Sequence, residues 1–210
     1  MTILDLDGLA ATPVATDPFP HVVVPRFVRH ERLAEVVAAL PPLASRGSHP
    51  VEGLKLGETA IRLMDEMKGE AFRQAVAGKF GLDLAGAPVM VTLRGQTDSR
   101  DGHIHRDSNS KRVTVLLYLN PAAASWARQE GCLRLLRRPD DLEDYAVEVP
   151  PVDGTLLVFP NGPSTWHGHR TFTGRRYTVQ LNYMTTDARA RYELGRHRVS
   201  ALLKRLAPAA

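Results

Sequence analysis

The 210-residue sequence predicts an α+β fold in which helices buttress a β-sandwich or barrel that encloses a small-ligand cavity. Two segments, residues 113–119 and 176–183, alternate with a period of two, which is typical of β-strands. Segments near both ends have apolar residues at helical spacing. Hydrophobic residues make up 43% of the chain and charged residues 24%, as in ordinary globular domains. We therefore expect one domain, residues 1–210, with its β-core at about residues 88–184.

Helices are expected on either side of the β-core. Residues 31–40 have apolar side chains at helical spacing and stop before Pro41. A second helical stretch is expected at about residues 58–80, broken near Gly69, and a third at residues 185–206. These helices would cover the outside of the β-core.

Two polar connecting segments are candidates for substrate selection. Residues 96–102 form a polar loop that could act as a lid, and residues 121–130 are expected to be a loop or a short helix. Neither segment carries a recognisable recognition motif. The substrate therefore stays unidentified, and it could be a small molecule or a protein side chain.

Each alternating segment has one apolar face and one face with polar residues. The apolar faces carry Val, Leu and Tyr only. Because successive side chains of a strand point to opposite faces, the polar faces are expected to look into a pocket. The side chains on these pocket faces are Thr114, Leu116 and Tyr118 in the first segment and Arg176, Thr178, Gln180 and Asn182 in the second.

A candidate metal site consists of His105, Asp107 and His167. The first two residues are two positions apart and would point to the same face of a β-strand. His167 would add a third ligand from a distant segment. Two histidines and one carboxylate occupy three corners of an octahedron and leave three open, which suits non-haem Fe(II) and oxygen chemistry.

Arg176 is a candidate for binding an acidic co-substrate. It follows His167 by nine residues and opens an alternating segment. A guanidinium group stays charged and pairs with a carboxylate through two parallel hydrogen bonds. 2-Oxoglutarate fits such a site, since its 2-oxo acid end can chelate a metal while its other carboxylate needs a cation. Arg175 is a rival, but the alternation places only one of the two on the inner face.

The remaining histidines have other expected roles. His103 and His169 compete as ligands, because each lies two positions from a candidate metal ligand; we expect them to support the metal ligands or to face the substrate. Only His105 has an acid two residues later. The other four histidines are expected on the surface: His21, His30, His49 and His197.

Three sequence blocks resemble the Fe(II)/2-oxoglutarate-dependent dioxygenases, specifically their prolyl-4-hydroxylase-like branch. The first block starts at His105-Arg106-Asp107 and runs to residue 120. The second is residues 131–135, and the third is residues 154–179, which include Trp166-His167-Gly168. The resemblance extends over about residues 89–183. One departure is that the family usually has Gly-Gly where this chain has Glu130-Gly131 or Gly131-Cys132.

This resemblance implies a double-stranded β-helix (jelly-roll) core and a dioxygenase that uses Fe(II), 2-oxoglutarate and O2. Hydroxylation of an unactivated C–H bond, with release of succinate and CO2, is the reaction it implies. A halogenase would need a small residue in place of Asp107. The implied metal ligands are His105, Asp107 and His167, and the implied residues of the 2-oxoglutarate pocket are Arg176, Tyr118, Thr114, Leu116 and Leu133.

Composition argues against several other partners and locations. The formal net charge is +4 and the pI about 9.5, but the basic residues are scattered and aromatic residues make up only 6%, so nucleic acid is not an expected partner. Arg134 and Arg170 are expected on a solvated face. The sequence has no run of eighteen apolar residues, its first residues are acidic, and its single cysteine, Cys132, suits a reducing cytosol. We therefore expect a cytoplasmic protein without a membrane anchor; the oligomeric state is not predicted.

Two other classes of function remain open at this stage. A catalytic zinc site also has three protein ligands and an open position, so a hydrolase is conceivable. A non-catalytic, cupin-like metal-binding jelly roll that acts as a sensor or structural module is the other alternative. The zinc hydrolase has no use for Arg176 and Tyr118 on the open side of the metal.

Overall fold

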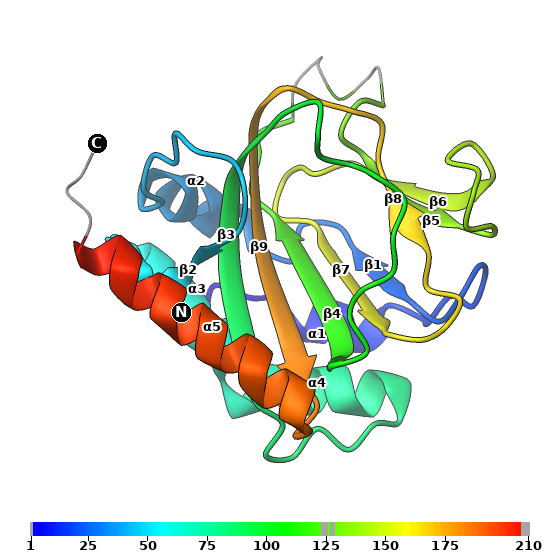
Figure 1. Ribbon diagram of the computed structural model, residues 1–210, viewed down its shortest axis with the longest axis horizontal. Coiled ribbons are helices and arrows are strands. Elements are labelled where there is room, and N and C mark those ends of the chain that lie inside the picture. Colours follow the sequence, from blue (N-terminus) through cyan, green and yellow to red (C-terminus); the bar gives the residue numbers. More distant parts are fainter. Residues whose placement is uncertain (1, 123–125, 127–128, 207–210) are drawn as a thin grey trace.

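The structure is a computed structural model that describes residues 2–122, 126 and 129–206. The predicted connector at residues 121–130 therefore falls partly outside the described residues. Two antiparallel β-sheets and a set of helices make up the fold (Figure 1). This arrangement confirms the predicted α+β class.

The larger sheet has six strands and the smaller sheet has three, and all paired strands are antiparallel. The larger sheet has the order β1 (Val22–Val24), β7 (Leu156–Pro160), β4 (Lys111–Tyr118), β9 (Gly174–Met184), β3 (Val89–Thr97) and β2 (His49–Pro50). The smaller sheet has the order β6 (Tyr145–Val149), β5 (Leu133–Leu136) and β8 (His167–Gly168). Strands β4 and β9 lie side by side in the middle of the larger sheet.

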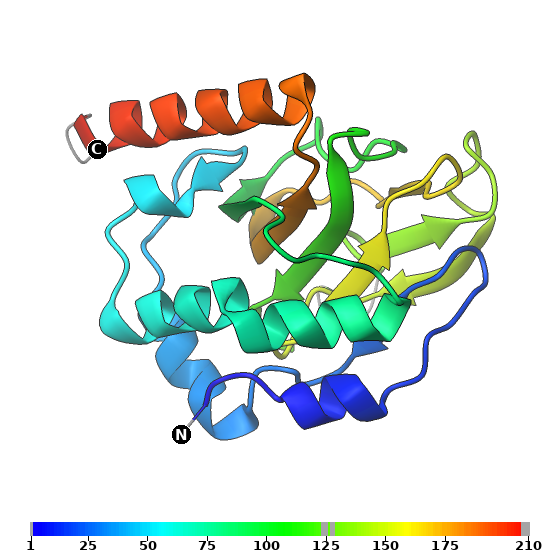
Figure 2. The ribbon, with the colours of Figure 1, turned by 90° about the horizontal axis from the view of Figure 1, so that it is seen from below.

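Four helices lie on one face of the larger sheet, and the C-terminal helix runs along the β2 side (Figure 2). The four are α1 (Leu6–Ala11), α2 (His30–Ala38), α3 (Glu58–Lys68) and α4 (Glu70–Phe80). Gly69 separates α3 from α4, as predicted, because its extended backbone ends one helix and begins the next. The C-terminal helix α5 (Ala188–Leu206) contacts β2 and the short 3-10 helix η1 (Val51–Gly53).

The period-two pattern of β4 and β9 divides the core into two parts. Val113, Val115 and Leu117 belong to the large apolar core on the helix side of the sheet, together with the apolar face of β9. Leu116 and Tyr118 belong to a smaller core between the two sheets. Hydrophobic burial on both faces fixes the register of these strands, because a one-residue slip would exchange the two faces. The space between the sheets is where the polar inner faces meet.

Three expectations about polar residues were wrong. His21 and His49 are buried rather than on the surface, because backbone carbonyls of Phe19 and Ser45 bind their rings at 2.8 and 3.2 Å. Arg134 is fully buried rather than solvated. Its charge is compensated by carboxylates of Glu143 and Glu148, each 2.6 Å away, which is the condition under which a guanidinium can be buried.

The helices of the structure can be compared with the length and polarity that a membrane span needs. Within the described part of the chain, every helix is too short or too polar to cross a lipid bilayer.

Candidate metal centre and co-substrate pocket

The three candidate metal ligands come together in the structure. Potential ligand atoms of His105, Asp107 and His167 all lie within 4.8 Å of one another. The two histidines pair through their backbones, with N···O distances of 2.9 and 3.0 Å, and their ring centroids are 4.4 Å apart. His105 forms only an isolated bridge, and Asp107 lies in the segment before β4, so the pair does not share a regular strand as the spacing had suggested.

Hydrogen bonds fix both imidazole rings in a metal-binding orientation. Nδ1 of His105 lies 2.8 Å from the carbonyl oxygen of His103, and Nδ1 of His167 lies 3.0 Å from that of Thr165. Since a carbonyl oxygen can only accept, each Nδ1 carries the proton and each Nε2 keeps its lone pair for a metal. Burial, together with the nearby His105, lowers the pKa of His167 to about 4, so its ring is neutral at physiological pH.

Both carboxylate oxygens of Asp107 are held by side chains from the start of β4. Lys111 Nζ donates to Oδ1 at 2.5 Å, and the Thr114 hydroxyl donates to Oδ2 at 2.5 Å. Burial alone would raise the pKa of Asp107, but the Lys111 charge and these hydrogen bonds lower it on balance. Asn161 donates to Thr114 at 3.0 Å and fixes its hydroxyl. The shortest polar contact of Thr114 is thus with the candidate metal ligand.

A cavity of about 250 Å³ begins at the two imidazoles and runs between the sheets. The structure brings the sequence-predicted pocket residues into its wall, while Asp107 lies beside it. The sequence-predicted residues in the cavity wall are His105, His167, Thr114, Leu116, Tyr118, Leu133, Arg176, Thr178 and Gln180. The rest of the wall is formed by Arg94, Thr97, Arg100, Asp101, Gly102, His103 and His169.

Arg176 and Tyr118 form a polar end of the cavity. Arg176 is 5% exposed, whereas Arg175 points outward and is exposed, which agrees with the predicted alternation. Nε of Arg176 donates to the Gly131 carbonyl at 2.8 Å, and Nη1 makes only a long contact of 3.4 Å with Thr178. Its guanidinium carbon lies 5.3 Å from the ring centroid of Tyr118. Spare guanidinium donors therefore point into the cavity.

The Tyr118 hydroxyl is the clearest sign of a missing polar ligand. It is completely buried and has no hydrogen-bond partner among the described residues. Burial raises the pKa of Tyr118 to about 12, so the group is a neutral donor. An unpaired buried hydroxyl is costly unless a ligand satisfies it. A carboxylate placed between Tyr118 and Arg176 would do so, which fits the distal carboxylate of 2-oxoglutarate.

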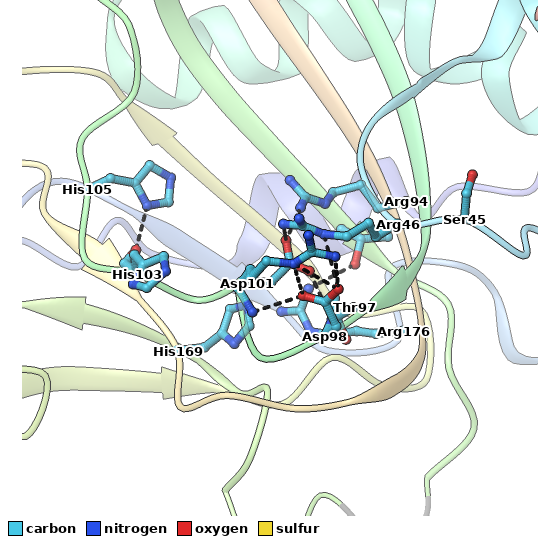
Figure 3. A network of polar contacts seen from close by, with 12 residues as sticks. Ser45, Arg46, Arg94, Thr97, Asp98, Asp101, His103, His105, His169 and Arg176 are labelled. Carbon is cyan, nitrogen blue, oxygen red and sulfur yellow. Dashed lines mark hydrogen bonds and ion pairs between the residues drawn. The ribbon is translucent and has the colours of Figure 1, made fainter.

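The two competing histidines lie outside the metal cluster. Within the described residues, the one group of three potential ligands that is close enough to hold a metal contains neither His103 nor His169. His169 is buried, and its Nδ1 donates to the Arg170 carbonyl at 2.8 Å. Figure 3 shows His169 near Asp101 and His103 next to His105, and both histidines line the cavity. Their position agrees with a supporting or substrate-facing role.

Several residues at the site had no signal in the sequence. Lys111 and Asn161 fix Asp107 and Thr114, and Arg94 and Asp101 form part of the cavity wall. Nothing in the sequence pattern distinguishes Arg94 or Lys111 from the other basic residues of the chain. The role of Asn161 depends on a contact across 47 positions of the chain, and the roles of Lys111 and Arg94 depend on how the segment between β3 and β4 folds.

Comparison with known proteins finds similarity to one superfamily of enzymes. Residues 92–184 match the 2OG-Fe(II) oxygenase superfamily. A comparison with curated proteins gave no match. Among solved structures, a Pseudomonas putida prolyl-4-hydroxylase is similar with a TM-score of 0.53 and 19% identity, over 86% of this chain and 91% of the other. A Trichoplax adhaerens prolyl hydroxylase in complex with a peptide fragment of hypoxia inducible factor has a TM-score of 0.56 and 18% identity, over 98% and 91%.

A third structure, the viral collagen prolyl hydroxylase of Paramecium bursaria Chlorella virus-1, has a TM-score of 0.53 and 12% identity, over 83% of this chain and 94% of the other. The superfamily implies Fe(II), 2-oxoglutarate and O2, which confirms the expected cofactors, and oxidoreductase chemistry. Residues 92–184 therefore resemble the 2OG-Fe(II) oxygenase superfamily, and the chain shares the double-stranded β-helix fold of the prolyl hydroxylases among the solved structures.

Proposed function

We propose that this protein hydroxylates an unactivated C–H bond at the expense of 2-oxoglutarate and O2. One oxygen atom of O2 enters the product alcohol, the other enters succinate, and C1 of 2-oxoglutarate leaves as CO2. The observation that carries this proposal is the joining of the His105, Asp107 and His167 cluster with the Arg176 and Tyr118 end in one cavity. A simple metal-binding module would have no use for the Arg176 and Tyr118 end of the cavity.

His105, Asp107 and His167 are proposed to hold the metal on one face. Bound Fe(II) would supply a site at which 2-oxoglutarate chelates and O2 is activated. The protein's own contribution is to keep both Nε2 atoms unprotonated through the Nδ1 hydrogen bonds. Lys111 and Thr114 hold the Asp107 carboxylate in a single orientation.

Arg176 and Tyr118 are proposed to bind the distal carboxylate of 2-oxoglutarate. The guanidinium would donate two parallel hydrogen bonds, and the hydroxyl would donate a third. Leu116 and Leu133 line the same part of the cavity, so they would pack against the methylene groups and exclude water. Orientation and exclusion of water are what the chain supplies to the reaction.

The substrate is proposed to be a protein side chain or a small molecule that reaches the metal through the cavity mouth. The Trichoplax relative is described with a bound peptide, which supports a side chain as one candidate. The described part of the mouth is lined mainly by polar residues from the segment between β3 and β4.

Succinate formation from 2-oxoglutarate, measured with and without Fe(II), tests the proposal. The wild-type protein is expected to release succinate only with Fe(II), and Asp107→Ala is expected to abolish this release. Arg176→Ala should chiefly raise the KM for 2-oxoglutarate, whereas Arg175→Ala, at the exposed neighbouring position, is the matched control and should not. If both Asp107→Ala and Arg176→Ala keep wild-type turnover, the proposed roles are wrong.

A further inference from the structure

We propose that Arg94 forms a second anion site at the mouth of the cavity, and that this site receives a carboxylate of the primary substrate. The inference rests on the proposed function, because it assumes that 2-oxoglutarate occupies the Arg176 end. Arg94 lies on β3 directly opposite Thr178 of β9, so it is on the strand next to Arg176. It lines the same cavity, and its side chain is 30% exposed.

Most N–H donors of the Arg94 guanidinium have no acceptor among the described residues. Its Nη2 donates to Oδ1 of Asp101 at 3.0 Å, and this is its only hydrogen bond among the described residues. Figure 3 shows the Arg94 and Arg46 side chains both directed towards Asp101. A guanidinium offers five N–H donors in a planar fork, so most of the donors of Arg94 remain for a ligand.

Asp101 cannot compensate this charge alone. Its Oδ1 also accepts from Arg46 at 3.3 Å, and its Oδ2 accepts from the backbone N–H of Asp98 at 3.0 Å. The carboxylate of Asp98 is shared by Arg46 at 3.5 Å and Arg100 at 2.6 Å. Three guanidinium groups therefore share two carboxylates in this cluster, which leaves it with one excess positive charge.

The excess positive charge of this cluster remains after the co-substrate binds. The two carboxylates of 2-oxoglutarate are used by the metal and by Arg176 in the proposed function. Arg94 and Arg176 repel each other, and the Arg94 charge contributes to a lowered pKa of Arg176, after burial as the main cause. An anion at Arg94 would relieve this repulsion.

Because the cavity is small, we assign this anion to a group of the primary substrate. At about 250 Å³ the cavity is smaller than the pockets of roughly 300–1,000 Å³ that enclose drug-sized ligands. With 2-oxoglutarate inside, only a small part of the substrate can approach the metal. A substrate carboxylate would then rest at the mouth, where the free donors of Arg94 can clamp it and hold the reacting carbon in place.

Calorimetric titration of the full-length protein, loaded with Mn(II) in place of Fe(II) and saturated with 2-oxoglutarate, tests the inference. The probes are N-acetylglycine and its neutral counterpart N-acetylglycinamide. A second pair is a capped Ala-Asp-Ala peptide and its Ala-Asn-Ala counterpart, which distinguishes a free small acid from an acidic peptide residue. The wild-type protein is expected to bind the acid of at least one pair about tenfold or more tightly than the neutral partner.

Arg94→Gln is expected to remove this preference and to leave the affinity for 2-oxoglutarate within about threefold of wild type, a change of under 1 kcal/mol. Arg175→Gln, outside the cavity, is the control and should change neither. Arg94→Lys replaces the glutamine variant if the latter does not fold, and it should weaken the preference because an ammonium group cannot form the planar fork.

Three results would overturn the inference: no acid preference in the wild-type protein for either pair, an unchanged preference in the Arg94 variants, or a loss of 2-oxoglutarate binding in Arg94→Gln. The last result would assign Arg94 to the co-substrate. Failure of the wild-type protein to bind 2-oxoglutarate at all would instead refute the proposed function, so the two failures are distinguishable.

Discussion

The buried hydroxyl of Tyr118 has no hydrogen-bond partner in the described structure, although its ring lies 5.3 Å from the guanidinium carbon of Arg176. The two residues come from adjacent strands β4 and β9, in which Tyr118 pairs with Thr178. A donor left unpaired beside a partly unpaired cation is a site prepared for an anion. The inner face of the sheet therefore offers Tyr118 and Arg176 together to the distal carboxylate of the proposed co-substrate.

Tyr118→Phe should weaken 2-oxoglutarate binding by about tenfold, since a hydrogen bond to a charged group contributes roughly 1.5–3 kcal/mol. The stability of the ligand-free protein should not fall, because the hydroxyl has no partner to lose. Tyr183→Phe is the matched control: its hydroxyl is also buried and unpaired, but the residue belongs to the helix-side core. Equal 2-oxoglutarate affinity in all three proteins, measured by titration, would remove Tyr118 from the site.

Thr114→Val should lower the affinity for Fe(II) by about tenfold or more, because groups that orient metal ligands typically contribute that much. The substitution keeps the shape of the side chain and removes the 2.5 Å hydrogen bond to Asp107. Thr114→Ser retains a hydroxyl and is expected to restore most of the affinity. Metal titration under anaerobic conditions measures both; wild-type affinity in the valine variant would show that Asp107 needs no such support.

Glu193 connects helix α5 to the loop that carries Asp107, and its charge predicts a pH-dependent stability. Its carboxylate accepts hydrogen bonds from Ser108 at 2.9 Å and Ser110 at 2.6 Å. Burial opposes ionisation, but these bonds lower the pKa of Glu193 below its ordinary value of 4.5 on balance. The lowered pKa stabilises the folded protein above pH 4.5, and this contribution is lost as the pH falls through the folded-state pKa.

Glu193→Gln is accordingly expected to reduce the free energy of unfolding by about 1 kcal/mol at neutral pH, and by less as the pH drops below the ordinary carboxyl pKa. Urea unfolding at a series of pH values measures the difference. Glu35→Gln, at a position whose side chain is 55% exposed on α2, is the control. A pH-independent difference in the Glu193 variant would refute the assigned role.

Gly168→Ala should disturb the metal site through the backbone. A Cβ atom at this position would lie 2.9 Å from the Gly102 carbonyl oxygen and 3.2 Å from Cα of Ile104, so strand β8 would have to move away from the segment that holds His105. We expect at least a tenfold loss of metal affinity, about 1.4 kcal/mol. Gly162→Ala, where the nearest atom would be 3.8 Å away, should bind metal normally. Metal titration that finds no difference between the two would contradict the predicted shift.

Local patterns in the sequence were sufficient to predict the inner faces of β4 and β9. The alternation placed Thr114, Leu116 and Tyr118 on one side and Val113 and Val115 on the other, and burial in two separate cores follows that division. The same rule selected Arg176 over Arg175. Period and spacing are properties of a single strand, so they can be read without knowledge of the tertiary structure.

Contacts between distant segments could not be predicted in this way. The burial of Arg134 depends on Glu148 of the neighbouring strand, and Asp101 meets Arg46 across 55 positions of the chain. The expectation that His105 and Asp107 share a strand was wrong because the chain leaves regular pairing between β3 and β4, where only His105 bridges to His167. Loop geometry of this kind is decided by tertiary packing rather than by local propensity.

A crystal structure of the protein with Mn(II) and 2-oxoglutarate would test the central proposal most directly. We predict one ion bound by His105, Asp107 and His167, with the distal carboxylate of 2-oxoglutarate on Arg176 and the Tyr118 hydroxyl. An ion held by His103 or His169 in place of one of these ligands, or a distal carboxylate that leaves Arg176 and Tyr118 unpaired, would contradict the account.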